Sequence, residues 1–214
     1  VILVTSGAIA TGLPLLGLEV KPDDLATSQA LASVGQGRLI SRYQQSLERY
    51  GIIAGQVLLT AQDLEGEETT INAKRAMERL LELRVIPIVN ENDTVATAEI
   101  RFGDNDRLAA LVAELLQADI LVLLSDVDAL YTAPPAEPGA TRVVSVAADD
   151  QLENVKIGGS SSTVGTGGAE TKVSAAKLAN ASGIPVLLTS TANVSAALEG
   201  QDVGTWFEAV KAGE

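Results

Sequence analysis

The alternation of apolar runs with helical segments constrains this chain more than any other feature of its sequence. Runs of strand length, such as 52–59 and 85–89, are each followed by a segment whose apolar residues recur at helical spacing. Hydrophobic residues make up 46% of the chain but aromatic residues only 3%, so the core is expected to consist of Val, Ile, Leu and Ala, as in a parallel sheet covered by helices. We therefore predict an α/β fold with a mostly parallel open sheet and helices on both of its faces.

The individual elements follow from the same pattern. Polar residues at 60–70 predict an exposed and mobile stretch, and glycines near 35 and 37 predict a break in a long helix. The expected strands are short apolar runs at 1–4, 52–59, 85–89, 119–124, 143–146, 184–188 and 204–207. The expected helices lie at 23–50, in a segment ending near 84, and at 104–117, 169–181 and 194–198. The segments 131–140 and 158–168 are expected to be loops, and no linker divides the chain into domains.

Composition limits the chemistry available to the chain. It contains no Cys and no His, which excludes disulfides, thiolate catalysis, a Ser-His triad and an imidazole base. A formal net charge of −13 argues against nucleic acid and an anionic membrane surface as partners, and no apolar run approaches membrane-spanning length. If the ligand is an anion, the cations that bind it are expected to be few and local.

Two polar clusters lie close together in the middle of the chain. Asn-Glu-Asn-Asp at 90–93 follows the predicted strand 85–89, and Gly-Asp-Asn-Asp at 103–106 precedes an apolar helix. The carboxyl end of a parallel strand beside a helix N-terminus is where open α/β sheets bind ligands, and a core needs none of these polar residues. The pair therefore predicts a binding site, although either cluster alone is equally compatible with a polar turn and an Asp N-cap.

Three further segments have the character of strand-end loops. Thr-Ser-Gly-Ala-Ile-Ala at 5–10 and Leu-Ser-Asp-Val-Asp at 124–128 suit a nearby ligand, and each is alternatively an ordinary turn. Gly-Thr-Gly-Gly-Ala-Glu-Thr-Lys at 165–172 is more specific, because glycines free backbone N–H groups to wrap phosphate oxygens, although its spacing is not that of a Walker A loop. Lys172 opposes the dipole of the helix that it opens, so a bound anion explains it better than a solvated side chain in a disordered loop.

Together these segments predict phosphoryl transfer. They comprise loops at successive strand ends, one phosphate-type loop, and Asp residues for Mg²⁺ or for organising lysines, with no nucleophile–base pair. Phosphoryl transfer depends on positioning and on stabilisation of charge, so a strong base is dispensable.

The same segments resemble the amino-acid kinase family. The matching motifs at 4–10, 88–99, 103–106, 124–126 and 165–172 run in the family's order through nearly the whole chain. The resemblance implies the family's αβα-sandwich fold. The pairing of Asn-Glu-Asn-Asp with Gly-Asp-Asn-Asp is typical of the branch that phosphorylates the side-chain carboxylate of L-glutamate in the first step of proline biosynthesis.

The resemblance implies roles for individual residues. Lys172 is similar to the lysine that stabilises the transferring phosphoryl group, and Asp106 to the aspartate that organises the catalytic lysines. ATP and Mg²⁺ are the implied cofactors, with no protein ligand of the metal assigned. The implied glutamate-binding residues are Ser6, Asn90, Asp93 and Asn105. The implied nucleotide-binding residues are Ser125, Asp126, Thr166, Gly167, Gly168, Ala169, Glu170, Thr171 and Lys172.

The resemblance also implies a cytoplasmic homo-oligomer, with proline as a feedback inhibitor acting near 63–70. The chain begins at Val1 inside an apolar run. The family's first strand, with its Lys-x-Gly-Ser/Thr motif, has no counterpart in this sequence. The C-terminal PUA domain of the family has no counterpart either. We therefore expect residues 1–214 to be an amino-acid kinase domain that lacks this strand and is inactive alone. The alternatives are an acetylglutamate, aspartate or uridylate kinase-like member of the family, or a non-catalytic ligand-binding fragment.

Overall fold

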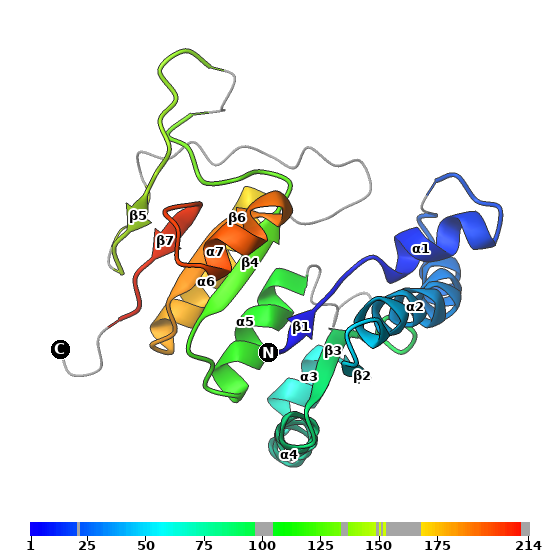
Figure 1. The fold of residues 1–214 in the computed structure, drawn as a ribbon. Helices are drawn as coiled ribbons and strands as arrows, with labels where there is room; N and C mark the ends of the chain where they lie inside the picture. Colours follow the sequence, from blue (N-terminus) through cyan, green and yellow to red (C-terminus); the bar gives the residue numbers. More distant parts are fainter. Residues whose placement is uncertain are drawn as a thin grey trace. The chain divides into compact units, whose positions relative to one another are not determined.

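A computed structural model describes residues 1–20, 22–96, 105–133, 137–148, 150, 152 and 168–210. The chain forms two compact units, Val1–Leu108 and Ala109–Glu214, each built from strands and helices (Figure 1). The predicted α/β class is confirmed, since mostly parallel sheets are flanked by helices in the described part of the chain. The predicted loop at 158–168 lies outside the described residues, apart from Gly168.

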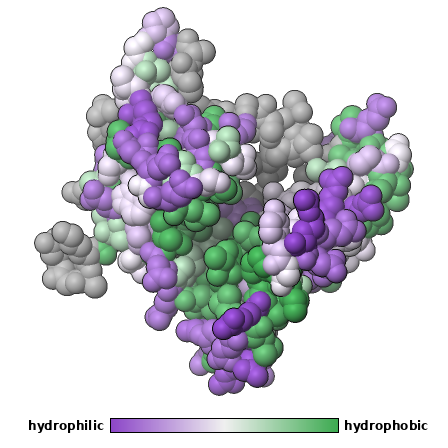
Figure 2. All heavy atoms as spheres, in the orientation of Figure 1, coloured by the Kyte–Doolittle hydropathy of each residue, from purple (hydrophilic) through white to green (hydrophobic). Residues whose placement is uncertain are grey.

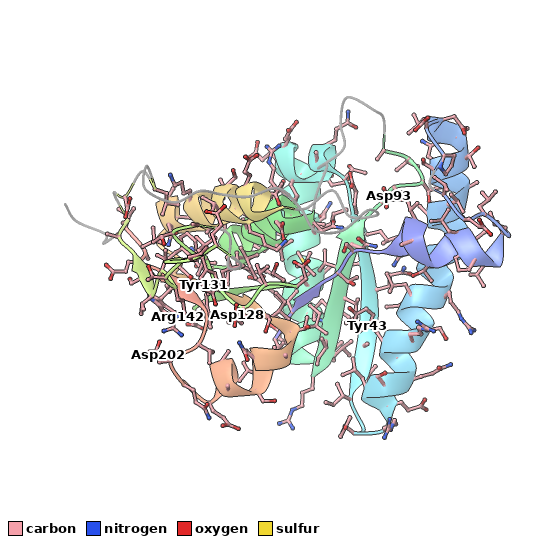
Figure 3. All side chains as sticks on the ribbon, turned by 90° about the horizontal axis from the view of Figure 1, so that it is seen from above. Tyr43, Asp93, Asp128, Tyr131, Arg142 and Asp202 are labelled. Carbon is pink, nitrogen blue, oxygen red and sulfur yellow. The ribbon has the colours of Figure 1, made fainter. Side chains whose placement is uncertain are left out.

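The first unit contains a three-stranded parallel sheet. Its order is β1 (Leu3–Val4), β3 (Val85–Glu91), β2 (Ile53–Leu59), so the strand that carries the first polar cluster is central. Ile88 and Val89 on β3 are 1% and 0% exposed, as the apolar run of a buried parallel strand predicts. Helices α2 (Leu25–Glu48) and α4 (Glu67–Glu82) lie on opposite sides of these strands (Figure 3).

Helix α2 is continuous, so the predicted break near Gly35 and Gly37 is wrong. A Cβ at Gly35 would collide with the backbone of α1 (Ala8–Leu15), which means that glycine is needed here for close approach between two helices. Asp24 begins α2 by accepting a hydrogen bond of 2.8 Å from the Thr27 backbone N–H, and this bond lowers the pKa of Asp24. Helix α2 therefore starts at a capping residue and continues through both glycines.

The polar stretch 60–70 is exposed at 65–69, as predicted, but it is helical. Thr60 and Asp63 form a capping box at the start of α3 (Ala61–Glu65): the Thr60 hydroxyl accepts from the Asp63 N–H at 3.3 Å, and the Asp63 carboxylate accepts from the Thr60 N–H at 2.7 Å. Helix α4 then starts directly at Glu67. The stretch is helical because its side chains supply the partners that a short helix needs at its N-terminus.

The second unit contains a four-stranded mixed sheet. Its order is β4 (Leu121–Ser125), β6 (Val186–Ser190), β7 (Thr205–Phe207), β5 (Ser145–Val146). Strands β4 and β6 are parallel, as are β5 and β7, while β6 and β7 are antiparallel. Every residue of β6 is buried, and α6 (Ala169–Ala181) and α7 (Val194–Leu198) pack against it.

Two elements complete the chain. The short helix η1 (Thr191–Asn193) directly precedes α7, and α5 (Asn105–Leu115) begins in the first unit and ends in the second. Each predicted strand is present, with ends that differ by one or two residues from the prediction. The helices predicted at 169–181 and 194–198 match α6 and α7 residue for residue, whereas α1 and α3 had no predicted counterpart.

The surface is mixed in polarity. Figure 2 shows hydrophobic residues near the carboxyl end of α1, where Leu15, Leu16 and Leu18 are exposed. Among the described residues, no helix combines the length and the apolar character needed to cross a membrane.

Candidate active site

Asn90 is the centre of a buried polar cluster in the first unit. Strand β3 continues two residues beyond its predicted end, which places Asn90 on the strand at 1% exposure. Its Nδ2 donates to Gln36 Oε1 at 2.7 Å, and its Oδ1 accepts from Asn105 Nδ2 at 3.2 Å and from the Glu91 backbone N–H at 2.9 Å. The structure thus brings together the two predicted site residues Asn90 and Asn105 from β3 and α5.

Ser6 lies at the same edge of the sheet. The register of β1 against β3 pairs Val4 with Val89, and the Thr5 N–H donates to the Val89 carbonyl at 2.8 Å. Because both strands are parallel, their carboxyl ends meet at one edge. Ser6 is exposed there, just before Gly7, whose φ of 97° suits glycine at the entry to α1.

Asp93 and Asp106 occupy the ends of the neighbouring elements. Asp93 is half-buried in the turn after β3, in which the Ala96 N–H donates to the Asn92 carbonyl at 3.1 Å, and Figure 3 shows Asp93 beyond the end of the strand. Asp106 lies in the first turn of α5, where the helix dipole favours a carboxylate. In the sequence, Asp93 closely follows Asn90, and Asp106 directly follows Asn105. Both aspartates therefore belong to the two polar segments that predicted a binding site.

Gln36 is the member of this cluster that the sequence analysis missed. It lies on α2 and is 9% exposed, between Ala32 at 2% and Ile40 at 8%. These three residues are four apart, so they share one face of the helix. A polar residue within an otherwise apolar stripe was therefore the signal in the sequence, but a single amide in a long helix does not reveal what it contacts.

In the second unit, Ser125 and Asp126 follow β4 as predicted. Ser125 is the last residue of the strand and its hydroxyl donates to Asp126 Oδ1 at 3.1 Å. The Asp126 side chain is exposed. Nearby in sequence, the Tyr131 hydroxyl donates to the Asp128 carboxylate at 3.1 Å, and this bond raises the pKa of Tyr131 (Figure 3).

The start of α6 carries the described part of the predicted phosphate loop. Gly168 is the N-cap, and the Thr171 hydroxyl donates to its carbonyl at 2.8 Å. Lys172, the fourth residue of the helix, is only 9% exposed, which argues against a solvated surface lysine. Glu170 is exposed. Thr166, Gly167 and the side chain of Ala169 lie outside the described residues.

The described residues contain no group of three or more Asp, Glu, His or Cys side chains that could hold a metal ion. Mg²⁺ keeps several waters and usually binds through one or two carboxylates together with substrate phosphates.

Comparison with known proteins identifies the class. Residues 1–190 match the amino acid kinase family, and the chain belongs to this family. Its fold is similar to that of a carbamate kinase from Giardia lamblia bound to AMP-PNP, with a TM-score of 0.66 and 15% identity over 94% of this chain and 80% of that one.

Within the family, the chain is similar to glutamate 5-kinases. It is 67% identical to the one from Clavibacter michiganensis over 97% of this chain and 80% of the relative, and 67% identical to the one from Leifsonia xyli over 97% and 77%. The relative from Thermobifida fusca is 56% identical over 99% of this chain and 55% of its own length. The predicted resemblance to the glutamate-phosphorylating branch is thereby confirmed.

Proposed function

We propose that the protein transfers the γ-phosphoryl group of ATP to the side-chain carboxylate of L-glutamate, forming glutamyl 5-phosphate in the first step of proline biosynthesis. The observation that carries this proposal is the 67% identity to glutamate 5-kinases along 97% of the chain. The chemistry agrees with the composition. A glutamate carboxylate is already ionised at neutral pH, so its oxygen attacks the γ-phosphorus, the bond to ADP breaks, and no general base is required of a chain without His.

The acceptor-binding residues of this proposal are Ser6, Asn90, Asp93 and Asn105. Their chemistry suits an amino acid, because the Asp93 carboxylate and amide oxygens accept from an ammonium group, while amide N–H and hydroxyl groups donate to a carboxylate. The support is their placement after β1, at the end of β3, in the turn after β3 and at the start of α5, together with the hydrogen bond between Asn90 and Asn105.

The nucleotide-binding residues of this proposal are Ser125, Asp126 and the segment 166–172. In this proposal, the positive charge of Lys172 stabilises the transferring phosphoryl group. A charge that is positioned in advance favours the transition state more than the ground state. Asp106 organises the catalytic lysines, as the motif match implies. Mg²⁺, when bound, neutralises charge on the phosphates.

Regulation and assembly belong to the same proposal. Proline is proposed as a feedback inhibitor that acts through the segment 63–70, and the enzyme as a cytoplasmic homo-oligomer in which residues 1–214 act as one kinase domain. The support is the match of this segment to the family. Its order in α3 and α4 is compatible with a binding role.

A substrate panel tests the proposed reaction. The full-length protein is incubated with ATP and Mg²⁺ and with glutamate, aspartate, acetylglutamate, carbamate or uridylate. Acyl phosphates are trapped as hydroxamates, and ADP release is measured for all acceptors. We expect glutamate alone to support turnover. Preference for another acceptor would assign the chain to a different branch, and nucleotide or glutamate binding without turnover would support a non-catalytic fragment.

A further inference from the structure

One backbone N–H determines the orientation of three side-chain amides, those of Gln36, Asn90 and Asn105. The Glu91 N–H is a donor only, so the atom of Asn90 that faces it at 2.9 Å must be the oxygen. Asn90 therefore turns its Nδ2 to Gln36, which must present Oε1, and accepts from Asn105, which must present Nδ2. Amide flips, which are otherwise ambiguous in structures, are decided here by the network.

The network ends in two buried atoms that have no partner. With the orientations above, Gln36 is left with Nε2 and Asn105 with Oδ1, and neither atom has a hydrogen-bond partner among the described residues. Buried polar atoms nearly always have a partner, and leaving one unpaired costs free energy. The Oδ1 of Asn105 therefore remains available to a donor from outside the described residues, and the ammonium group of an amino acid is such a donor.

We propose that Gln36 is a positioning residue for the acceptor, one that acts through Asn90 and Asn105. Its Oε1 holds the Asn90 amide so that Asn90 Oδ1 accepts from Asn105, and Asn105 Oδ1 is thereby presented to the substrate ammonium group. This inference rests on the proposed function, because it takes the ligand to be glutamate.

The role follows from what each amide does when the partner is lost. Without an acceptor at residue 36, the Nδ2 of Asn90 is buried and unpaired, and only the Glu91 N–H opposes a flip of Asn90. A flipped Asn90 presents Nδ2 to Asn105, which must then turn its own oxygen inward and its Nδ2 toward the substrate. A donor that faces an ammonium group repels it. The KM is therefore expected to rise only for phosphoryl acceptors that carry an ammonium group.

The test compares glutamate with glutarate, which has the same two carboxylates and no amino group. Gln36→Met removes the acceptor at nearly constant length, whereas Gln36→Glu keeps an oxygen for Asn90 Nδ2 to donate to. We expect Gln36→Met to raise the KM for glutamate about tenfold or more, the scale of a lost hydrogen bond to a charged group, with little change in the KM for ATP or for glutarate. Gln36→Glu is expected to retain the preference for glutamate over glutarate.

Gln45→Met and Gln45→Glu are the matched controls, because Gln45 lies on the exposed side of the same helix. An unchanged glutamate preference in Gln36→Met would overturn the inference. An equal loss in Gln36→Met and Gln36→Glu would also overturn it, since Nε2 and not Oε1 would then be the atom that matters. If the wild type neither binds nor phosphorylates glutamate, the proposed function itself fails, which is a distinct outcome.

A measurement on the wild type keeps the inference falsifiable if Gln36→Met does not fold. The network predicts that the side-chain NH₂ of Asn90 is protected from hydrogen exchange before any ligand is added, because it donates to Gln36 in the free protein. Rapid exchange of this group in the ligand-free chain would show that the hydrogen bond from Asn90 to Gln36 is not formed, and the positioning role of Gln36 would be wrong.

Discussion

The proposed acceptor region and the proposed nucleotide region are built in different ways. In the acceptor region, Gln36, Asn90 and Asn105 come from α2, β3 and α5, and their hydrogen bonds join segments 15 and 54 residues apart in the sequence. In the nucleotide region, the hydrogen bonds of Ser125 with Asp126 and of Thr171 with Gly168 span one and three residues. The hydrogen bonds of the first region therefore depend on tertiary packing, whereas these two bonds of the second region lie within a strand end and a helix start.

The difference predicts different effects of substitution. A relay of buried amides positions a small ligand before it arrives, so damage to it should appear in the KM of the acceptor and in stability. In the proposed function, the segment 166–172 with Lys172 acts on phosphates whose charge changes during the reaction, so damage there should appear in kcat.

The largest effect is expected from Lys172→Ala. Loss of the charge aimed at the transferring phosphoryl group should lower kcat by roughly 100-fold or more, the scale seen when one preorganised electrostatic contact is removed, with little change in the KM for glutamate. Hydroxamate formation under saturating ATP measures it. Lys177→Ala is the matched control, because Lys177 is exposed on the same helix. An unchanged kcat would make Lys172 a structural residue.

Asn105→Ala should act on the acceptor side. We expect the KM for glutamate to rise about 10- to 100-fold through loss of a hydrogen bond to a charged group, with the KM for ATP nearly constant. Ser6→Ala should show the same selectivity with a smaller rise, because Ser6 is exposed. Initial rates with each substrate varied in turn decide this. A change in the KM for ATP alone would mean that the two subsites are wrongly assigned.

Two glycines of α2, Gly35 and Gly37, test whether helix packing supports the hydrogen bonds of Gln36, Asn90 and Asn105. A Cβ at Gly35 would meet the carbonyl of Ala8 on α1, so Gly35→Ala should lower the free energy of unfolding by about 1–3 kcal/mol. Gly37 is exposed and has open space around it, so Gly37→Ala should raise stability by up to about 1 kcal/mol. Urea unfolding measures both. Equal effects would show that the contact between α1 and α2 is looser than the structure indicates.

The smallest effect is expected from Thr60→Ala, which removes one half of the capping box of α3. Loss of an N-cap hydroxyl typically costs about 1 kcal/mol, which thermal unfolding detects, and catalysis should be unaffected. Gln62→Ala, an exposed change in the same helix, is the control. A larger loss of glutamate affinity in Thr60→Ala than in Gln62→Ala would connect this segment with the acceptor region.

Much of the fold could be predicted from local patterns. The apolar runs predicted every strand to within two residues, and α6 and α7 have the bounds predicted for them. The errors at 35–37 and 60–70 have one cause. Glycine breaks an exposed helix but also permits close helix contact, and a polar run is a loop unless its side chains cap a helix. In both cases the outcome depends on what the segment touches.

For the candidate site, the polar clusters, the glycine-rich segment and the family could be predicted from the sequence, because these depend on residue types at fixed short spacing. The contacts of Gln36 with Asn90 and of Asn90 with Asn105, the burial of Lys172 and the position of β3 between β1 and β2 became visible only in the folded chain. Hydrogen bonds within a few residues are set by the local chain, whereas burial and long-range hydrogen bonds depend on which elements pack together. A glutamine in an apolar stripe is therefore visible in the sequence, but its partner is not.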